Sequence, residues 1–269
     1  DTKNMKIIVC YLITRFDDDK SLKIFIEKYR LNKSGVFHDL LICFKLLNGD
    51  QILAKKKLLK DINYIEYIDN SAFNDFDLGS YNRIARDFPS KLIFFLNGNS
   101  YPTCHNWLKM VTDNYDNNSV IGTSASNLSM LSSLRLKKFY KFIGYYLKKM
   151  KYKKLFDKFP NPHLRTNGFL IRSNDFVSFM SNKTIKKKED VWCIESGKSS
   201  LTNFFKSKGF EIYVINSDGD KFPENSWMQS KTFNYLDQDK FIISDNQIRK
   251  YSSLNEFEKK SQQYNTWGE

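Results

Sequence analysis

The sequence predicts an α/β protein in which helices flank a mostly parallel central sheet. Short apolar runs alternate with helical patterns along residues 6–96. The clearest run, residues 91–96, has five apolar members out of six, which is typical of a strand covered on both faces. It stops at the polar turn Asn97-Gly98-Asn99-Ser100. Because ligands of open α/β sheets lie just beyond the carboxyl ends of such strands, we expect chemistry at this turn.

The first part of the chain predicts alternating strands and helices. The Asp17-Asp18-Asp19 run suits the start of a helix, because acidic side chains are favourable at the positive end of the helix dipole. The expected order implies parallel strands joined by right-handed crossovers, which is a Rossmann-like half that binds a nucleotide. We expect strands at residues 6–14, 39–47, 64–68 and 91–96, with helices at 17–31, 51–61 and 81–87.

The rest of the chain predicts a less regular continuation. Residues 1–220 are expected to form one domain, in which residues 134–160 are a basic helical insertion. Residues 221–269 are polar and less periodic, so we expect an irregular C-terminal extension packed on the core. Between these limits we expect helices at 107–115 and 201–205, a helix that ends at Ser181, and strands at 120–123 and 210–215.

The positive charge of the chain is concentrated in one segment. The 269 residues carry a formal net charge of +13, and residues 134–158 alone hold ten Lys or Arg and one Asp. Apolar residues at helical spacing share this segment with the lysines. One interpretation is a lid or connector helix whose lysines are solvated. The other is an interfacial helix that docks on anionic lipid or on a polyanionic acceptor.

Several classes of protein lack their signatures in this sequence. A Walker phosphate loop, a Gly-x-Gly-x-x-Gly turn and a Gly-x-Ser-x-Gly elbow are all missing. No apolar run reaches the roughly 18 residues that span a bilayer, and the first residues have no signal-peptide layout. The four cysteines lack the paired spacing of a zinc site. We therefore expect a cytoplasmic protein with reduced thiols, peripheral at the inner face of the membrane if the interfacial interpretation holds.

Four features resemble nucleotide-sugar glycosyltransferases of the GT-A fold. The first two are the block DFDLGSY at residues 75–81 and the strand that ends in LNGNS, together with the order of elements around them. The motifs NPHLRTNGFLI and ESGKSSLT look like those of bacterial glycosyltransferases found with capsule and O-antigen genes. The resemblance covers residues 6–220. It implies transfer of a sugar from a nucleotide-diphosphate sugar to a hydroxyl of a surface-polysaccharide or lipid-linked glycan acceptor.

The resemblance also implies where the nucleotide sugar binds. Thr14 and Arg15 would border the base, and Asp75 and Asp77 would accept hydrogen bonds from the ribose or the base. Gly79 follows these aspartates, and we expect it to adopt a backbone conformation that other residues reach only at a cost.

The turn after residue 96 bears on metal dependence. In many GT-A enzymes an Asp-x-Asp at this place holds a divalent metal on the diphosphate. This chain has Asn97 and Asn99 there, and hard cations favour anionic oxygen ligands. We therefore expect no metal cofactor. A Mg²⁺ or Mn²⁺ site at Asp75-Phe76-Asp77 is the alternative.

Without a metal, a cationic side chain must offset the charge of the diphosphate leaving group. Arg165 is the first candidate because its planar guanidinium suits phosphate oxygens, with Lys198 and His163 behind it. An ion pair that fixes the loop is the alternative role for Arg165. Asn167 of the same motif is assigned to the donor, and His163 and His105 to the acceptor, although each histidine also has a structural interpretation.

The resemblance finally implies a catalytic base. In inverting GT-A enzymes a carboxylate near the start of the helix before the last core strand removes the proton of the acceptor hydroxyl. Glu195, beside Ser196-Gly197, would stand at such a helix start and face the cleft. Asp190 is the second candidate, and its position after a lysine run also suits a solvated turn. A capping role for either residue remains open, as does retaining stereochemistry.

Two other functions remain open at this point. A basic module could bind nucleic acid or an anionic membrane through residues 134–158 without any catalysis. A nucleotidyltransferase would need a metal-binding carboxylate pair, which the LNGNS turn lacks. The glycosyltransferase hypothesis expects a nucleotide sugar and a glycan as partners and no nucleic acid.

Overall fold

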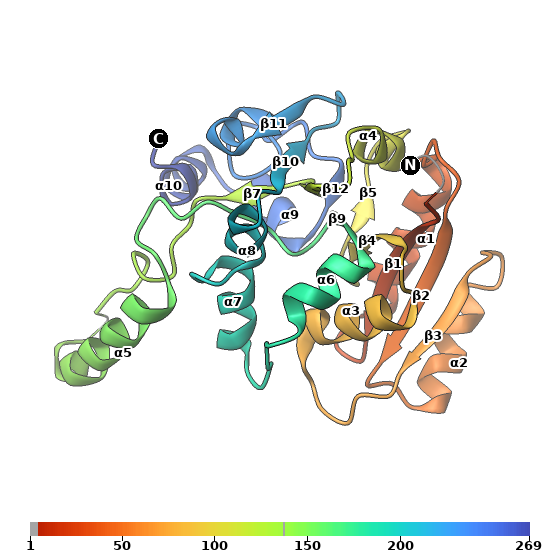
Figure 1. Ribbon diagram of the computed structural model, residues 1–269, viewed down its shortest axis with the longest axis horizontal. Coiled ribbons are helices and arrows are strands. Elements are labelled where there is room, and N and C mark those ends of the chain that lie inside the picture. Colours follow the sequence, from red (N-terminus) through yellow and green to blue (C-terminus); the bar gives the residue numbers. More distant parts are fainter. Residues whose placement is uncertain (1–4, 137) are drawn as a thin grey trace.

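The computed structural model describes residues 5–136 and 138–269, which form a central sheet between two layers of helices (Figure 1). Its strands are β1 (Ile7–Thr14), β2 (Asp39–Lys45), β3 (Ile65–Asp69), β4 (Leu92–Leu96), β6 (Ser119–Gly122), β9 (Phe169–Arg172), β10 (Glu211–Ile215) and β11 (Lys221–Pro223). In space they follow the order β11-β10-β6-β9-β4-β1-β2-β3. Two further pairs of short strands join β5 (Tyr101–Pro102) to β12 (Ile243–Ser244) and β7 (Ala125–Ser126) to β8 (His163–Leu164).

Most of the central sheet is parallel, which confirms the expected α/β class. β1 pairs in parallel with β2 and β4, β2 with β3, and β6 with β10. β9 and β11 run the other way, and β9 lies between β4 and β6. The sequence did not predict β9. Because an antiparallel strand starts where its neighbours end, β9 brings residues 163–168 to the carboxyl ends of β4 and β6.

Apolar side chains fill both faces of the sheet. Ile8, Cys10 and Leu12 of β1 pack on one side, and the intervening residues pack on the other. The first side is covered by α3 (Phe76–Asp87), α6 (Ser173–Met180), α7 (Lys188–Ser196) and α8 (Leu201–Ser207). The second is covered by α1 (Asp19–Leu31), α4 (Trp107–Asp113) and the end of α2 (Gly49–Leu58). Burial on both faces explains why these strands are continuous apolar runs.

Helix α3 begins at Phe76, earlier than the predicted start near Tyr81. Gly79 therefore lies inside a helix and is not among the glycines with positive φ, so the expectation of an unusual backbone there is wrong. A Cβ at Gly79 would lie 2.0 Å from Cγ of Asp75. The glycine is needed because the Asp75 side chain approaches the helix axis at this point.

The C-terminal segment is not irregular, which corrects a second expectation. Residues 221–269 contain β11, which extends the central sheet, and β12, which pairs with β5. They also contain α9 (Asn246–Ser252) and α10 (Glu256–Trp267). Trp267 belongs to the core cluster on the α3 side of the sheet, and its indole N–H donates to the carbonyl oxygen of Phe233 at 2.9 Å. Helical caps at Asp245 and Asn255 start the two helices.

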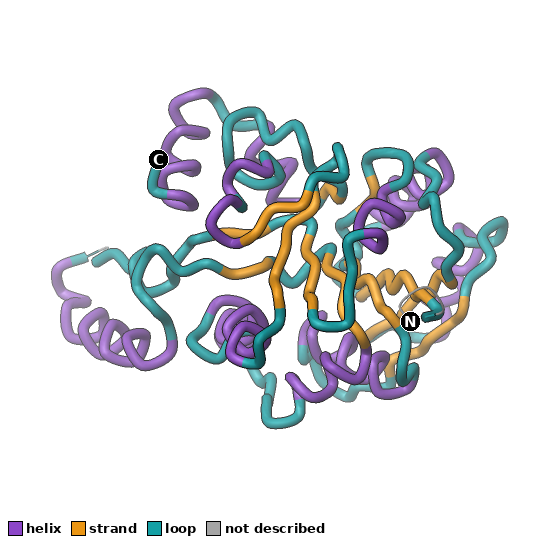
Figure 2. The backbone as a smooth tube through the Cα atoms, turned by 45° about the horizontal axis from the view of Figure 1, so that its top comes forward, coloured by secondary structure: helices purple, strands orange, loops and turns teal. Residues whose placement is uncertain are grey.

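Helix α5 (Phe142–Leu155) forms the expected basic helical insertion. It projects from the body of the protein in both views, beside α7 (Figure 1, Figure 2). Its last turn is anchored by Tyr152 and by Phe156, which pack with Leu131, Trp192 and Cys193. In the described ranges, no helix is both long enough and apolar enough to cross a membrane.

Candidate functional site

The loop after β1 and the turn after β4 interlock at the carboxyl edge of the sheet. Asp17 accepts hydrogen bonds from the backbone N–H and the hydroxyl of Thr14, at 2.7 and 2.8 Å, and from Nδ2 of Asn99 at 3.2 Å. A Cβ at Gly98 would lie 2.5 Å from Cγ of Asp17. The Tyr11 hydroxyl donates to the carbonyl oxygen of Gly98 at 2.7 Å. The two strand tips therefore form one rim, and Asp17 joins them.

The asparagines at this edge mainly hold the backbone in place. Oδ1 of Asn97 accepts from the N–H of Asn99 at 3.1 Å and from the hydroxyl of Ser100 at 2.7 Å. Oδ1 of Asn167 accepts from the N–H of Asn97 at 3.0 Å. Nδ2 of Asn167 donates to Asp245 at 3.1 Å. The tip of β4, the segment before β9 and the start of α9 are thus linked through buried side chains.

Glu195 reaches this edge from α7. It lies in the last turn of that helix, so its expected position at a helix start is wrong. Oε1 accepts from the N–H of Thr166 at 2.9 Å and from the Thr166 hydroxyl at 3.2 Å. Within the described residues, Oε2 has no hydrogen-bond donor. Glu195 therefore has one carboxylate oxygen fixed and the other available.

Asp77, in the first turn of α3, faces the same space. Burial raises the pKa of its carboxyl group from 3.8 to about 6, and the negative charges of Asp17 and Glu195 raise it further against the opposing charge of Lys45. No hydrogen bond or ion pair to the Asp77 side chain occurs among the described residues. Three acidic side chains from three separate elements thus interact across the carboxyl edge of the sheet.

A metal centre was tested against these carboxylates. No group of three or more His, Cys, Asp or Glu side chains within residues 5–136 and 138–269 is close enough together to hold a metal ion. Asp17 is occupied by donors from Thr14 and Asn99, as described above. The side chains of this edge do not fit a metal site made by the protein alone.

Asp75 lies in a buried ionic network rather than at the open edge. Its carboxylate pairs with Lys45, which is fully buried, and with Nη1 of Arg83 at 2.6 Å. Arg83 also binds both oxygens of Asp69, at 2.7 Å each. Burial would raise the pKa of Asp75, but hydrogen bonds from Arg83 and Lys45 outweigh it and lower the pKa. The network places Asp75 below the surface, where Asp75 anchors β2 and β3 to α3.

Arg165 is also paired within the protein. Nη2 lies 2.8 Å from Oδ2 of Asp245, Nη1 donates to the Ser124 hydroxyl at 3.2 Å, and the guanidinium stacks 4.1 Å from the ring centre of Phe233. Asp245 is buried, which would raise its pKa, but the Arg165 charge and the N–H of Ile248 hold the pKa below its usual value. The loop-fixing alternative foreseen for Arg165 describes these contacts.

A different arginine reaches the rim without a counter-ion. Arg249 lies on α9, and its Nη2 donates to the carbonyl oxygen of Asn99 at 3.0 Å. Its guanidinium lies 5.2 Å from the ring centre of Tyr101. No carboxylate of the described chain lies within 4.0 Å of it. The sequence analysis missed Arg249, because nothing in the local pattern of the C-terminal segment links it to residues 97–100.

His163 lies behind Glu195 and is buried. Its Nδ1 is 2.7 Å from the carbonyl oxygen of Asn161. Burial lowers the pKa of the imidazole, although the negative charge of Glu195 opposes this. A neutral ring with its proton on Nδ1 satisfies the Asn161 carbonyl. His163 has little exposed surface with which to meet an acceptor directly.

The remaining predicted residues lie away from this edge or on its outside. Oδ2 of Asp190 accepts from the N–H groups of Lys186 and Lys187, so Asp190 caps the opposite end of α7. Lys198 donates to the carbonyl oxygen of Lys153 at 3.0 Å, beside the end of α5. The side chain of Arg15 is exposed and stacks 4.9 Å from the ring centre of Phe16.

His105 lies at the other end of the sheet. Its Nδ1 accepts from the N–H of Lys33 at 3.2 Å, after the end of α1 and before the start of β2. α1 starts at the carboxyl end of β1 and runs back beside it, so residue 33 lies near the amino ends of the strands. The expected acceptor contact at His105 therefore does not share an edge with Glu195.

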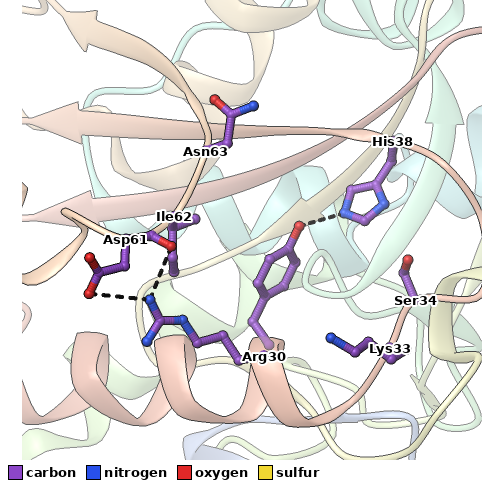
Figure 3. A pocket seen from close by; sticks show the side chains of 8 residues that line it. Arg30, Lys33, Ser34, His38, Asp61, Ile62 and Asn63 are labelled. Atoms are coloured by element: carbon purple, nitrogen blue, oxygen red, sulfur yellow. Dashed lines mark hydrogen bonds and ion pairs between the residues drawn. The ribbon is translucent and has the colours of Figure 1, made fainter.

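A pocket of about 280 Å³ also lies at that amino edge (Figure 3). The hydroxyl of Tyr29 and Nε2 of His38 are 2.7 Å apart there, and Nη2 of Arg30 donates to the carbonyl oxygen of Asp61 at 3.1 Å. The pocket is well formed but has none of the carboxylates discussed above. We place the candidate site at the carboxyl edge because the unpaired acidic and basic groups converge there.

Comparisons with other proteins describe the fold only. No family model and no curated protein matches the sequence. Among solved structures, 4-diphosphocytidyl-2C-methyl-D-erythritol synthase from Anaerococcus prevotii aligns over 82% of this chain and 93% of its own, with a TM-score of 0.47 and 11% identity. A nucleotidyl transferase from Methanothermobacter aligns over 77% and 97%, with a TM-score of 0.43 and 7% identity. A mannosyltransferase from Pyrobaculum calidifontis, in complex with GDP-Man and Mn²⁺, aligns over 54% and 39%, with a TM-score of 0.37 and 7% identity.

Proposed function

We propose that this protein is a glycosyltransferase that moves a sugar from a nucleotide-diphosphate sugar to a hydroxyl of a surface-polysaccharide or lipid-linked glycan acceptor. The observation that carries the proposal is Glu195 at the carboxyl edge of the sheet, with one oxygen held by Thr166 and the other available. Ligands of open α/β sheets bind at this edge. A fixed carboxylate with an available oxygen is what a general base requires.

The proposed reaction inverts the anomeric centre. Glu195 accepts the proton of the acceptor hydroxyl while that oxygen attacks the anomeric carbon. The bond from this carbon to the diphosphate oxygen breaks, and its electron pair leaves with the nucleoside diphosphate. Asp190 is not retained as the base, because its carboxylate is occupied by the cap of α7. Buried His163 helps to set the electrostatic environment of Glu195.

The charge of the leaving group is offset by Arg249 rather than by Arg165. Arg249 lies at the tip of β4 and has no carboxylate partner in the described chain, whereas Arg165 is neutralised by Asp245. Arg165, Asn167 and Asp245 act as positioning residues, because their contacts fix the start of α9. A guanidinium with free N–H donors suits phosphate oxygens.

The donor lies against the rim formed by Thr14, Asp17 and residues 97–99, with Asp77 beside it. We propose that transfer needs no metal, because Asn97 and Asn99 offer neutral side chains and the nearby carboxylates do not form a set of metal ligands. Asp77, which has a pKa of about 6, can donate or accept a hydrogen bond from a sugar or ribose hydroxyl near neutral pH.

Thermal-shift measurements with uridine, guanosine and thymidine diphosphates test the proposal. A ligand that binds only the folded state raises its melting temperature, so one of these nucleotides should shift the transition. Incubation of the protein with the matching nucleotide sugars and glycan acceptors then checks transfer by mass spectrometry. If no nucleoside diphosphate shifts the transition at saturating concentrations, the proposed donor site is wrong.

A further inference from the structure

Helix α5 carries an exposed apolar face that no part of the described chain covers. Five side chains on its first turns expose between 41% and 74% of their surface: Phe142, Ile143, Tyr146, Leu147 and Met150. Their spacing puts them on one side of the helix, because residues three, four and eight positions apart lie near one another. Tyr152, which anchors the helix to the body, is 1% exposed and lies on the opposite side.

Lysines surround this apolar face. Lys138 and Lys141 precede it, Lys148 and Lys149 flank it, and Lys153 and Lys154 follow it. Of the lysines within α5, only Lys151 has a carboxylate of the described chain within 4.0 Å, that of Glu189. The other lysine charges of the helix are therefore available to an anionic surface.

We propose that the apolar face of α5 and its surrounding lysines form a docking surface for a bilayer that contains anionic lipid. The apolar side chains would enter the boundary between headgroups and acyl chains, and the lysines would meet the negative headgroups. Charge complementarity favours this partner over a second copy of the chain, because a dimer through this face would bring two sets of lysines together. Aliphatic side chains such as Ile143 and Leu147 offer little to a nucleic acid.

The attachment of α5 links this surface to the carboxyl edge of the sheet. The N–H of Lys198 donates to the carbonyl oxygen of Leu155 at 2.9 Å, and Lys198 follows Glu195 closely in the chain. Trw192-side packing of α7 against Tyr152 and Phe156 holds the same junction. A bilayer on α5 would therefore lie beside the site, within reach of an acceptor carried on lipid. Membrane docking itself does not depend on the proposed reaction.

Vesicle co-sedimentation tests the proposal. The protein should bind vesicles that contain phosphatidylglycerol, bind pure phosphatidylcholine vesicles much more weakly, and lose affinity as salt is added. Ile143→Asp with Leu147→Asp should weaken binding more than tenfold, because two apolar side chains no longer enter the bilayer. Lys148→Ala with Lys149→Ala should weaken it by about fivefold for each lysine and reduce its salt dependence.

Matched controls lie elsewhere on the surface. Phe257→Asp on α10 replaces an apolar side chain that is 82% exposed, and Lys57→Ala with Lys60→Ala removes two charges outside α5. Both should bind vesicles as the unmodified protein does. Unchanged binding by Ile143→Asp with Leu147→Asp, or equal loss in the controls, overturns the proposal. All of these changes are at exposed positions, and unaltered thermal unfolding confirms that each variant is folded.

Two measurements distinguish the other occupants of this face. A concentration-dependent dimer that disappears in Ile143→Asp with Leu147→Asp, without vesicle binding, would assign the face to a second copy and overturn the proposal. Salt-sensitive binding to single-stranded DNA, again without vesicle binding, would assign it to nucleic acid and also overturn it. Glu195→Gln should bind vesicles normally, so failure of the proposed reaction and failure of docking are separable.

Discussion

The guanidinium of Arg165 lies 2.8 Å from the carboxylate of Asp245, which neutralises the arginine that the sequence motif directs to a phosphate. The other oxygen of Asp245 accepts the N–H groups of Gln247 and Ile248 and so starts α9. That helix carries Arg249 to the tip of β4. One arginine thus fixes the element that presents the other.

Arg249→Gln should weaken nucleoside diphosphate binding by about ten- to a hundredfold, because a charge-assisted hydrogen bond is worth about 1.5–3 kcal/mol. Calorimetric titration measures the affinity. Arg30→Gln, which removes an arginine at the amino edge of the sheet, is the matched control and should bind normally. Equal affinity of Arg249→Gln and the unmodified protein would remove Arg249 from the donor site.

Arg165→Gln should act mainly on stability. It leaves Asp245 buried without its ion-pair partner, and such a loss costs about 3–5 kcal/mol when the remaining charge is fully buried. Asp245 keeps hydrogen bonds from Asn167 and the backbone, so we expect about 2–3 kcal/mol. Urea unfolding measures the change. A variant as stable as the unmodified protein would contradict the positioning role.

Glu195→Gln should abolish transfer and leave nucleotide binding intact. Removal of a general base costs about 10²–10⁴ in rate, while the glutamine oxygen can still accept from Thr166. Turnover is followed by product mass spectrometry, and binding by calorimetry. Glu189→Gln, on the same helix but paired with Lys151 at its other end, is the control. Normal turnover of Glu195→Gln would exclude this residue as the base.

Asp77→Asn should stabilise the protein above pH 6. The folded-state pKa of about 6 exceeds the ordinary value of 3.8, so between these values the folded protein binds more protons than the unfolded chain. Stability therefore falls as the pH rises through this window, and the loss persists above it. Allowing for partial exposure, we expect a gain of about 2 kcal/mol at pH 7 that disappears below about pH 4. Urea unfolding across this pH range measures it.

Asp190→Asn is the control with the opposite sign. Hydrogen bonds from the N–H groups of Lys186 and Lys187 lower the pKa of Asp190, so its contribution is present above its unfolded pKa and is lost as the pH falls through its folded value. We expect a loss of no more than about 1 kcal/mol at pH 7 because the group is largely exposed. A destabilised Asp77→Asn at pH 7 would show that the charged form of Asp77 is the favourable one.

Gly79→Ala should destabilise the protein strongly. The new Cβ would lie 2.0 Å from Cγ of Asp75 and would displace it from Lys45 and Arg83. Disruption of a buried ion pair costs about 3–5 kcal/mol. Gly144→Ala, in α5, has nothing within 4 Å of the new Cβ and should gain about 0.5–1 kcal/mol through helix propensity. Chemical unfolding of both variants checks the contrast, and similar effects in the two would refute it.

Transfer should survive a metal chelator. The candidate site has neutral asparagines after β4, and its acidic groups do not form a set of metal ligands among the described residues. Activity is measured with and without EDTA, and again after Mg²⁺ or Mn²⁺ is restored. Complete loss with EDTA that either ion reverses would contradict a metal-independent reaction and would point to a cation held mainly by the substrate diphosphate.

Much of the fold could be predicted because its signal is local. Burial on both faces gives β1 and β4 continuous apolar runs, and these runs mark strands without knowledge of their neighbours. β9 was missed because its pairing between β4 and β6 joins residues far apart in the chain. The start of α3 was misplaced because Gly79 was interpreted as a turn residue, whereas its packing against Asp75 explains it.

The sequence by itself determined the fold class, the carboxyl edge as the place for chemistry, and the position of Glu195 and the basic helix along the chain. Only the tertiary structure decided which charges are used up and which remain available. Arg249 and Asn99 are 150 positions apart, yet they share a hydrogen bond of 3.0 Å. Periodicity reports on neighbours along the chain, but the partner of a charge depends on how distant segments return to the same edge of the sheet.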